Sequence, residues 1–145
     1  MMNSRNHTHV TLVTEDARNA RMLAGYLKRR AFAVNVLVIG RHEPHRFSVV
    51  VRGSGEVLLL DMGWFDPLRH ELYQALTWVV SVWQAPGLLL VDGSWPETWV
   101  SRFGDCRVLR KPFPMETFGD QVAALAVAAN AGPTVVHARA TRKGE

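Results

Sequence analysis

Short apolar segments alternate with segments of helical pattern along the whole chain. Each apolar segment ends near a polar residue or a glycine, and they are His9–Thr14, Phe32–Gly40, Glu56–Asp61, Gly87–Gly93 and Cys106–Phe113. Two of them contain "VLLLD" and "GLLLVDG", which are apolar without alternation, as is typical of strands buried on both faces of a parallel sheet. The pattern predicts an α/β fold with a single doubly wound, five-stranded parallel sheet and helices on both of its faces.

Apolar residues at helical spacing predict three regular helices. The first follows Asp16 and has a basic last turn, which suits the helix dipole. The second is Pro67–Gln84, with its proline in the first turn and an apolar face that starts at Leu68. The third starts at Pro114 and ends at a glycine, Gly132.

Two further helical segments are predicted to be short or irregular. Only a short helix fits between Ser94 and Phe103. In residues 41–55 the spacing of the apolar residues fits a short helix, whereas the β-branched run Val49–Val51 favours a strand. We expect a short, poor helix in this segment.

The composition is that of one globular domain. Of the 145 residues, 48% are hydrophobic and 21% are charged, and no apolar run approaches the length of a membrane span. The polar N-terminus lacks the apolar segment of a signal peptide, so we expect a cytoplasmic protein with no membrane partner. We expect a flexible N-terminus at 1–8, the domain at 9–131 and a loose basic tail at 132–145. Cys106 is the single cysteine, which excludes an internal disulfide and a thiolate metal cluster.

Charge and aromatic content limit the kinds of partner that this protein is expected to bind. The net charge of +4 lies mostly in the first helix and the tail, where a solvated helix face and a basic chain end explain it. No helix-turn-helix pattern follows the domain, so we do not expect direct nucleic-acid binding. Four of the five tryptophans fall in one third of the chain, and they are Trp78, Trp83, Trp95 and Trp99. They predict either a packed core or a docking surface.

Mostly polar residues lie where the predicted strands end. These strand-end residues are Thr14, Glu15, Asp16, Asp61, Val91, Asp92 and Lys111. In open parallel sheets, ligands bind at the carboxyl ends of the strands. Carboxylates gathered there need a hard cation such as Mg²⁺, or the lysine ammonium, to offset their repulsion, and a carboxylate beside a cation is a competent nucleophile towards phosphorus. The alternative is that these residues only cap helices and form turns.

Three segments together resemble a receiver domain of the bacterial two-component response regulators. "VLRKPFPMETF" is similar to the lysine–proline–phenylalanine signature of that family and the helix that follows it. "VLLLD" is similar to the strand that presents the phosphoacceptor aspartate, and "VTLVTEDARNARMLAGYLKRRAF" to the first strand, the acidic pair and the first helix. The resemblance covers Val10–Ala126 and implies the strand order 2-1-3-4-5.

The resemblance also implies roles for individual residues. Asp61 would accept a phosphoryl group from a histidine kinase, and Lys111 would contact that group. Glu15 would be the second acid of the pair that holds Mg²⁺, and Asp16 is a further candidate ligand. The peptide bond after Lys111 is usually cis in the family, and Pro112 allows it here.

The chain departs from the family at the positions that bind metal and sense a phosphate. Thr14 stands where the family has its first acid. The switch threonine or serine falls at Val91 or Asp92, with Ser94 two residues late, and the aromatic switch position falls at Val108. Valine cannot hydrogen-bond a phosphoryl oxygen, and an aspartate would repel one.

The turn after the strand that ends at Asp61 is also unusual. "MGWFDP" replaces the methionine–proline turn of the family and places Trp64 beside the pocket. Trp64, Trp95 and Trp99 are candidates for a surface that contacts a partner. The departures weaken phosphoryl-triggered switching and leave the scaffold intact. We therefore expect an atypical receiver without enzymatic activity, which acts through protein contacts while phosphorylation of Asp61 is absent or vestigial.

The expected partners are proteins: a histidine kinase, a regulator with an output domain, or a second copy of this chain. One alternative is a stand-alone receiver that a histidine kinase does phosphorylate. Another is an aspartate-based phosphatase or phosphotransferase, as in haloacid dehalogenase-like enzymes. Those enzymes need a second aspartate two residues after the nucleophile for acid–base work, and Gly63 occupies that position here.

Overall fold

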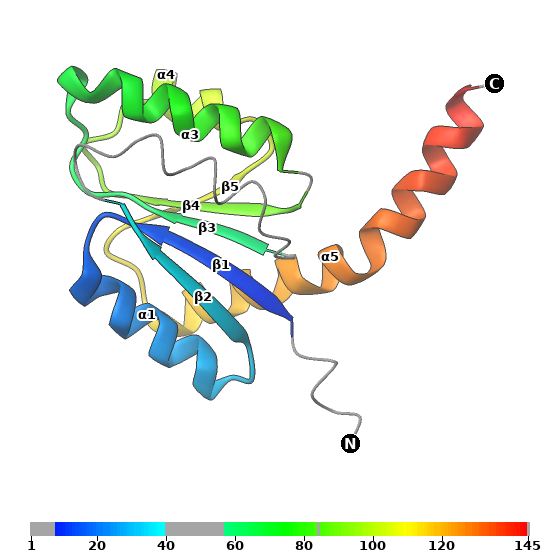
Figure 1. Cartoon of the computed structure of the whole chain (residues 1–145), viewed down its shortest axis with the longest axis horizontal. Helices are drawn as coiled ribbons and strands as arrows, with labels where there is room; N and C mark the ends of the chain where they lie inside the picture. Colours follow the sequence, from blue (N-terminus) through cyan, green and yellow to red (C-terminus); the bar gives the residue numbers. More distant parts are fainter. Residues whose placement is uncertain (1–7, 40–56, 84, 145) are drawn as a thin grey trace.

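A computed structural model describes residues 8–39, 57–83 and 85–144 of the chain, with side chains described up to Ala129. Five strands form one sheet in the order β2-β1-β3-β4-β5, and all neighbouring strands are parallel (Figure 1). The strands are β1 (His9–Thr14), β2 (Ala33–Val38), β3 (Val57–Asp61), β4 (Gly87–Val91) and β5 (Arg107–Arg110). The predicted fold class and strand order are confirmed.

Helices cover both faces of the sheet. They are α1 (Ala17–Arg29), η3 (Pro67–Arg69), α3 (His70–Val82), α4 (Glu97–Val100), η4 (Ser101–Phe103) and α5 (Met115–Gly144). α1 and α5 lie on one face, and α3 and α4 lie on the other (Figure 1). The helix between β4 and β5 is short, as predicted. Residues 41–55, where a helix and a strand were both open, lie outside the described part of the chain.

Two apolar layers, one on each face of the sheet, form the core. Leu59 and Leu88 face α1 and α5, whereas their strand neighbours Leu58 and Leu89 face α3. This alternation follows from the two-residue period of a strand. Every residue of β3 and of β4 is buried, as the unbroken apolar runs predicted.

The helix predicted at Pro67–Gln84 begins differently from the expectation. Its first turn is the 3-10 turn η3, and the regular helix α3 starts only at His70. Because the tighter turn rotates side chains away from the α3 face, Leu68 is 88% exposed, so its predicted place on the apolar face is wrong. Leu72 and Leu76 of the predicted face are buried.

The last helix is longer than predicted. α5 does not stop at Gly132 but continues to Gly144, so residues 132–144, expected as a loose tail, are helical. The helix continues although Gly132 and the next residue, Pro133, disfavour a helix interior by about 1 and about 3 kcal/mol, respectively. The end of α5 extends away from the sheet (Figure 1).

Candidate functional site

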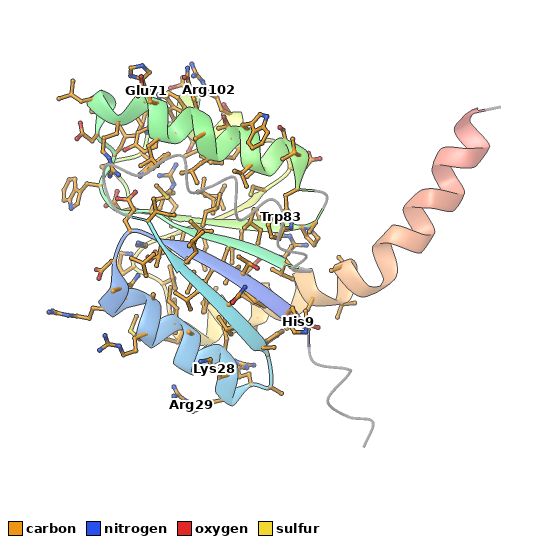
Figure 2. The ribbon with its side chains drawn as sticks, viewed as in Figure 1. His9, Lys28, Arg29, Glu71, Trp83 and Arg102 are labelled. Carbon is orange, nitrogen blue, oxygen red and sulfur yellow. The ribbon has the colours of Figure 1, made fainter. Side chains whose placement is uncertain are left out.

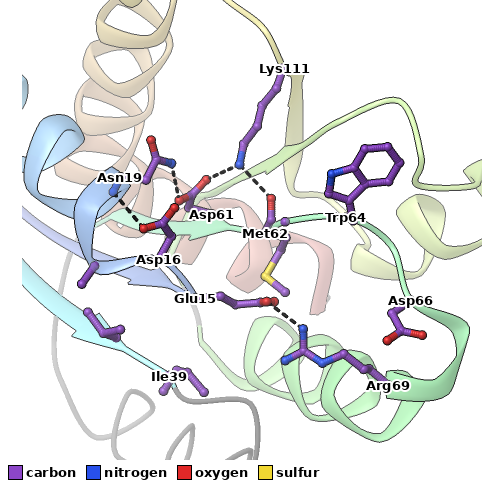
Figure 3. Close-up of a pocket in the computed structure, with 13 residues that line it drawn as sticks. Glu15, Asp16, Asn19, Ile39, Asp61, Met62, Trp64, Asp66, Arg69 and Lys111 are labelled. Carbon is purple, nitrogen blue, oxygen red and sulfur yellow. Dashed lines mark hydrogen bonds and ion pairs between the residues drawn. The ribbon is translucent and has the colours of Figure 1, made fainter.

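The carboxyl edge of the sheet holds a pocket around Asp61. Asp61 ends β3 directly opposite Thr14 of β1, and its side chain is 2% exposed. The pocket has a volume of about 540 Å³ and is lined by residues that follow β1, β2, β3 and β5 (Figure 3). The strand-end argument therefore placed the site correctly in the fold.

Both oxygens of the Asp61 carboxylate have partners from this chain. Oδ2 accepts hydrogen bonds of 2.7 Å from the Thr14 hydroxyl and from the Asn19 side-chain amide. Oδ1 lies 2.7 Å from the Lys111 ammonium as an ion pair, and the same ammonium donates a hydrogen bond of 2.8 Å to the carbonyl of Met62. Oδ2 is therefore satisfied by hydrogen bonds, whereas the buried Oδ1 has the Lys111 ion pair and no hydrogen-bond partner within the described residues.

Thr14 connects Asp61 to the start of α1. Its hydroxyl donates to Asp61 and accepts a hydrogen bond of 3.1 Å from the backbone N–H of Asp16. An acid at this position would repel Asp61, whereas the threonine hydroxyl binds it. The position where the family has its first acid thus holds a donor to the carboxylate.

Asp16, a candidate metal ligand, is the N-cap of α1. Its Oδ1 accepts hydrogen bonds from the backbone N–H groups of Arg18 and Asn19, at 2.9 and 3.3 Å. An N-cap carboxylate satisfies free N–H groups and the positive end of the helix dipole. The alternative interpretation of Asp16, as a residue that only caps a helix, therefore accounts for its contacts.

Glu15, the other candidate metal ligand, forms an ion pair with Arg69 of η3. The distance from Arg69 Nη1 to Glu15 Oε1 is 2.7 Å, and the side chains are 15% and 20% exposed, respectively. The pair joins the end of β1 to the turn that follows β3, and in Figure 3 the guanidinium lies against Glu15 below Met62.

Two contributors to this site, Asn19 and Arg69, were not predicted from the sequence. Asn19 is the third residue of α1, and Arg69 is the last residue of η3. A polar residue on a helix is usually solvated, so neither carried a signal by its type. The signal that could have found Asn19 is its place in the first helical turn, directly after the strand-end acids.

The described residues do not fit the Mg²⁺ ion that the resemblance implied. Mg²⁺ needs oxygen ligands in near-octahedral geometry. Asp16 is engaged at the helix cap and Glu15 by Arg69, and Asp61 is held by two hydrogen bonds and the Lys111 ion pair. Within the described ranges there is no group of three or more histidine, cysteine, aspartate or glutamate residues that could hold a metal ion.

The predicted switch positions are held by local contacts. The Ser94 hydroxyl donates to the carboxylate of Asp92 and accepts a hydrogen bond of 2.8 Å from the backbone N–H of Phe65. Arg110 of β5 donates to the carbonyl of Asp92 at 2.9 Å. Val108 is 38% exposed on β5 and offers no polar group. Hydrogen bonds therefore hold the β4–α4 loop against the β3–η3 loop and against β5.

The three candidate surface tryptophans differ in burial. Trp64 is 78% exposed, Trp99 is half-buried, and Trp95 is 2% exposed. The surface prediction is therefore wrong for Trp95, because its indole N–H donates a hydrogen bond of 2.8 Å to the carbonyl of Gly63 and its ring packs on Phe65. Trp95 belongs to the core.

Trp95 is part of an aromatic cluster beneath the site. Its ring also contacts Tyr73, Phe65 stacks on Tyr73, and Trp99 packs at the edge of the cluster. The Tyr73 hydroxyl accepts a hydrogen bond of 2.8 Å from the backbone N–H of Asp66, and burial raises the pKa of Tyr73. The cluster fixes the "MGWFDP" turn, which leaves Trp64 as the large exposed side chain beside the pocket (Figure 3).

The basic residues of α1 lie outside the site. Lys28 and Arg29, in its last turn, are exposed and point away from the sheet (Figure 2). This matches the expectation of a solvated helix face. Among the residues that the structure describes, no helix is both long and apolar enough to cross a membrane.

Comparison with known proteins gives similarity in structure only. No protein-family model and no curated protein matches the sequence. A two-component response regulator from Clostridium difficile is 15% identical, with a TM-score of 0.66 over 86% of this chain and 100% of its own. The signal receiver domain of a LuxO repressor protein from Vibrio parahaemolyticus is 15% identical, with a TM-score of 0.67 over 89% of this chain and 97% of its own.

A third similar structure is the chemotaxis response regulator CheY4 of Vibrio cholerae. It is 18% identical, with a TM-score of 0.62 over 83% of this chain and 99% of its own. In agreement with the resemblance, the Lys111–Pro112 peptide bond is cis. The chain therefore has the fold of a response-regulator receiver domain.

Proposed function

We propose that this protein is a receiver-type signalling module that acts through contacts with a partner protein, without phosphorylation of Asp61. The observation that carries the proposal is that Oδ2 of Asp61 accepts hydrogen bonds from Thr14 and Asn19 while Oδ1 is ion-paired with Lys111. It is a cytoplasmic, non-enzymatic module of a bacterial two-component system.

The first support concerns the chemistry of phosphoryl transfer. An attacking carboxylate oxygen must reach phosphorus, and cations must neutralise the charge on the transferring group. Oδ2 of Asp61 already accepts two hydrogen bonds, and Oδ1 is ion-paired. Lys111 is one cation beside Asp61, and the candidate ligands for a second cation, Glu15 and Asp16, are engaged elsewhere.

The second support concerns the response to a phosphoryl group. A phosphate could be sensed only by a hydroxyl or another donor that is free to move towards it. The Ser94 hydroxyl is held by Asp92 and by the backbone of Phe65, and Val108 has no polar group. The loop that would report phosphorylation is therefore already fixed.

The third support concerns the partner. Trp64 is a large aromatic side chain exposed beside the pocket, and such residues are enriched at the energetic centres of interfaces. A receiver domain in a structure of similar fold modulates a diguanylate cyclase from Pelobacter carbinolicus, so this fold can be combined with an output domain. A regulator with an output domain, a histidine kinase or a second copy of the chain fits the same reasoning.

A second candidate function is a stand-alone receiver that is phosphorylated on Asp61. It is favoured by the Asp61–Lys111 pair, which is in contact at 2.7 Å. The aspartate-based phosphatase is disfavoured, because Gly63 supplies no acid–base group two residues after Asp61.

Complementation of a deletion strain with the Asp61→Asn variant tests the proposal. Asparagine keeps the shape of the side chain and cannot form an acyl phosphate. We expect this variant to restore the transcript profile of the strain as well as the wild-type protein does, at equal protein abundance. A strain with Asp61→Asn that behaves like the deletion would favour the phosphorylated receiver instead.

A further inference from the structure

Four charged side chains at the Asp61 pocket form two ion pairs of opposite charges. Asp61 pairs with Lys111 and Glu15 pairs with Arg69, each at 2.7 Å. Asp16 is engaged at the N-terminus of α1. The charges within these two ion pairs therefore cancel without an added ion.

Arg69 supplies the positive charge that neutralises Glu15. It ends η3, a turn fixed by Asp66, whose side chain accepts a hydrogen bond of 3.0 Å from the backbone N–H of Leu68. Its guanidinium reaches the end of β1, where Nη1 contacts Glu15. Nη2 is buried and, within the described residues, has no hydrogen-bond partner. Burial of a guanidinium is costly unless a partner charge compensates for the lost hydration, and Glu15 is that partner here.

We propose that Arg69 is a built-in cation that takes the place of a divalent metal ion at this site. Relative to a site with an acid at position 14 and no cation at Glu15, Thr14 removes one negative charge and Arg69 adds one positive charge. Together the two residues change the charge of the site by as much as a divalent cation would. A metal ion entering the pocket would meet two ion pairs whose charges cancel, and the repulsion of Arg69 and Lys111. The other two acids that line the pocket, Asp16 and Asp66, each accept backbone hydrogen bonds at the start of a helical segment.

This inference deepens the proposed function and rests on it, since a module that works without a phosphoryl group needs no exchangeable metal. A covalently attached guanidinium cannot dissociate. The connection that Arg69 makes between the end of β1 and the turn after β3 is therefore independent of metal concentration. The β1–α1 loop and η3 then keep one arrangement under all metal conditions.

Binding of Mn²⁺, followed by electron paramagnetic resonance on the purified full chain, tests the inference. The proteins are wild type, Thr14→Asp, and Thr14→Asp combined with Arg69→Ala. We expect the wild type to bind no Mn²⁺ at about 1 mM, and the double variant to bind at least about tenfold more tightly than Thr14→Asp alone.

Arg107→Ala in the Thr14→Asp background is the matched control. Arg107 is an exposed arginine at the start of β5, at the opposite edge of the sheet, so its removal changes the net charge equally. We expect it to leave Mn²⁺ affinity unchanged. The inference is overturned if the wild type binds Mn²⁺ and loses it on Asp61→Asn, or if Arg69→Ala changes affinity no more than Arg107→Ala does.

Thermal melting of the single variant Arg69→Ala guards against a double variant that does not fold. We expect a melting temperature at least about 5 °C below that of the wild type, and partial recovery in about 10 mM Mg²⁺. The wild-type melting temperature should not respond to Mg²⁺, and a rise would overturn the inference. A wild type that binds metal while Asp61→Asn still complements the deletion strain would remove this inference alone and leave the proposed function standing.

Discussion

The Thr14 hydroxyl donates a hydrogen bond of 2.7 Å to the carboxylate of Asp61, its direct neighbour across the β1–β3 pair. Both side chains are buried. The contact places a neutral donor where the resemblance implied a second carboxylate. Repulsion between two acids is thereby exchanged for a hydrogen bond to a charged acceptor, and the site does not depend on a metal ion for that position.

Substitution of Thr14 by valine tests the energetic weight of this contact. Valine keeps the shape of the side chain and removes the donor, so one hydrogen bond to a buried charge is lost. We expect the free energy of unfolding to fall by about 1.5–3 kcal/mol, measured by urea denaturation. Thr77→Val is the control, because the Thr77 hydroxyl bonds an exposed carbonyl of its own helix and should cost less than about 0.5 kcal/mol. Equal effects of the two substitutions would contradict the account of the site.

Two helical glycines should respond oppositely to alanine. A Cβ on Gly119 of α5 would lie 2.8 Å from the Tyr26 ring and 2.5 Å from Arg30 Nη1, whereas one on Gly25 of α1 would meet only Arg29 Nη1, at 3.6 Å. Alanine raises helix propensity by about 1 kcal/mol at either position. Crowding between α1 and α5 should outweigh this gain at Gly119, giving a net loss of about 1 kcal/mol. Gly25→Ala should instead stabilise the protein by about 0.5–1 kcal/mol, and a gain at both positions would be inconsistent with the close helix contact.

Glycine in place of Ala31 should stabilise the protein. Ala31 follows α1 with a φ of 71°, in the left-handed region that disfavours a Cβ. Its N–H bonds the carbonyl of Lys28 and the N–H of Phe32 bonds that of Leu27, the pattern of a Schellman motif. Ala31→Gly should raise the free energy of unfolding by about 1 kcal/mol in urea denaturation, and a loss of stability would show that the helix does not end in this motif.

Cys106 should make stability fall at alkaline pH. Burial, with a smaller effect of Asp105, raises the pKa of its thiol from 9.0 to about 12. Above pH 9 the unfolded chain loses this proton and the folded protein keeps it, so stability declines as pH rises towards 12. Between pH 8.5 and 10.5 the wild type should lose about 2 kcal/mol more than Cys106→Ala, measured from urea midpoints at both pH values. Tyr73 titrates in both proteins, so it cancels in the comparison, and parallel pH profiles would contradict a raised pKa of the Cys106 thiol.

The sequence predicted the architecture of the sheet well, because strands buried on both faces consist of continuous apolar runs. "VLLLD" and "GLLLV" became strands with every residue buried. The limits of helices were harder, because several weak preferences compete there. A 3-10 turn at Pro67 turned Leu68 to solvent, and α5 continued through Gly132 and Pro133.

The candidate site was predictable only where residues end strands. Asp61 and Lys111 were expected at one edge of the sheet and lie in contact there. Asn19 and Arg69 reach the site from helical turns, and their roles depend on tertiary distances that no local pattern encodes. Trp95 was misassigned to the surface for the same reason, since only the fold brings its indole to the carbonyl of Gly63.

The intact mass of the protein after incubation with acetyl phosphate and Mg²⁺ tests the central claim, that Asp61 is closed to phosphorylation. The wild type and Asp61→Ala are measured side by side, with a known phosphorylatable receiver as a positive control for the reagent. The account predicts an unchanged mass for both forms of this protein. A gain of one phosphoryl group in the wild type alone would contradict it and would assign Asp61 the role of a working phosphoacceptor.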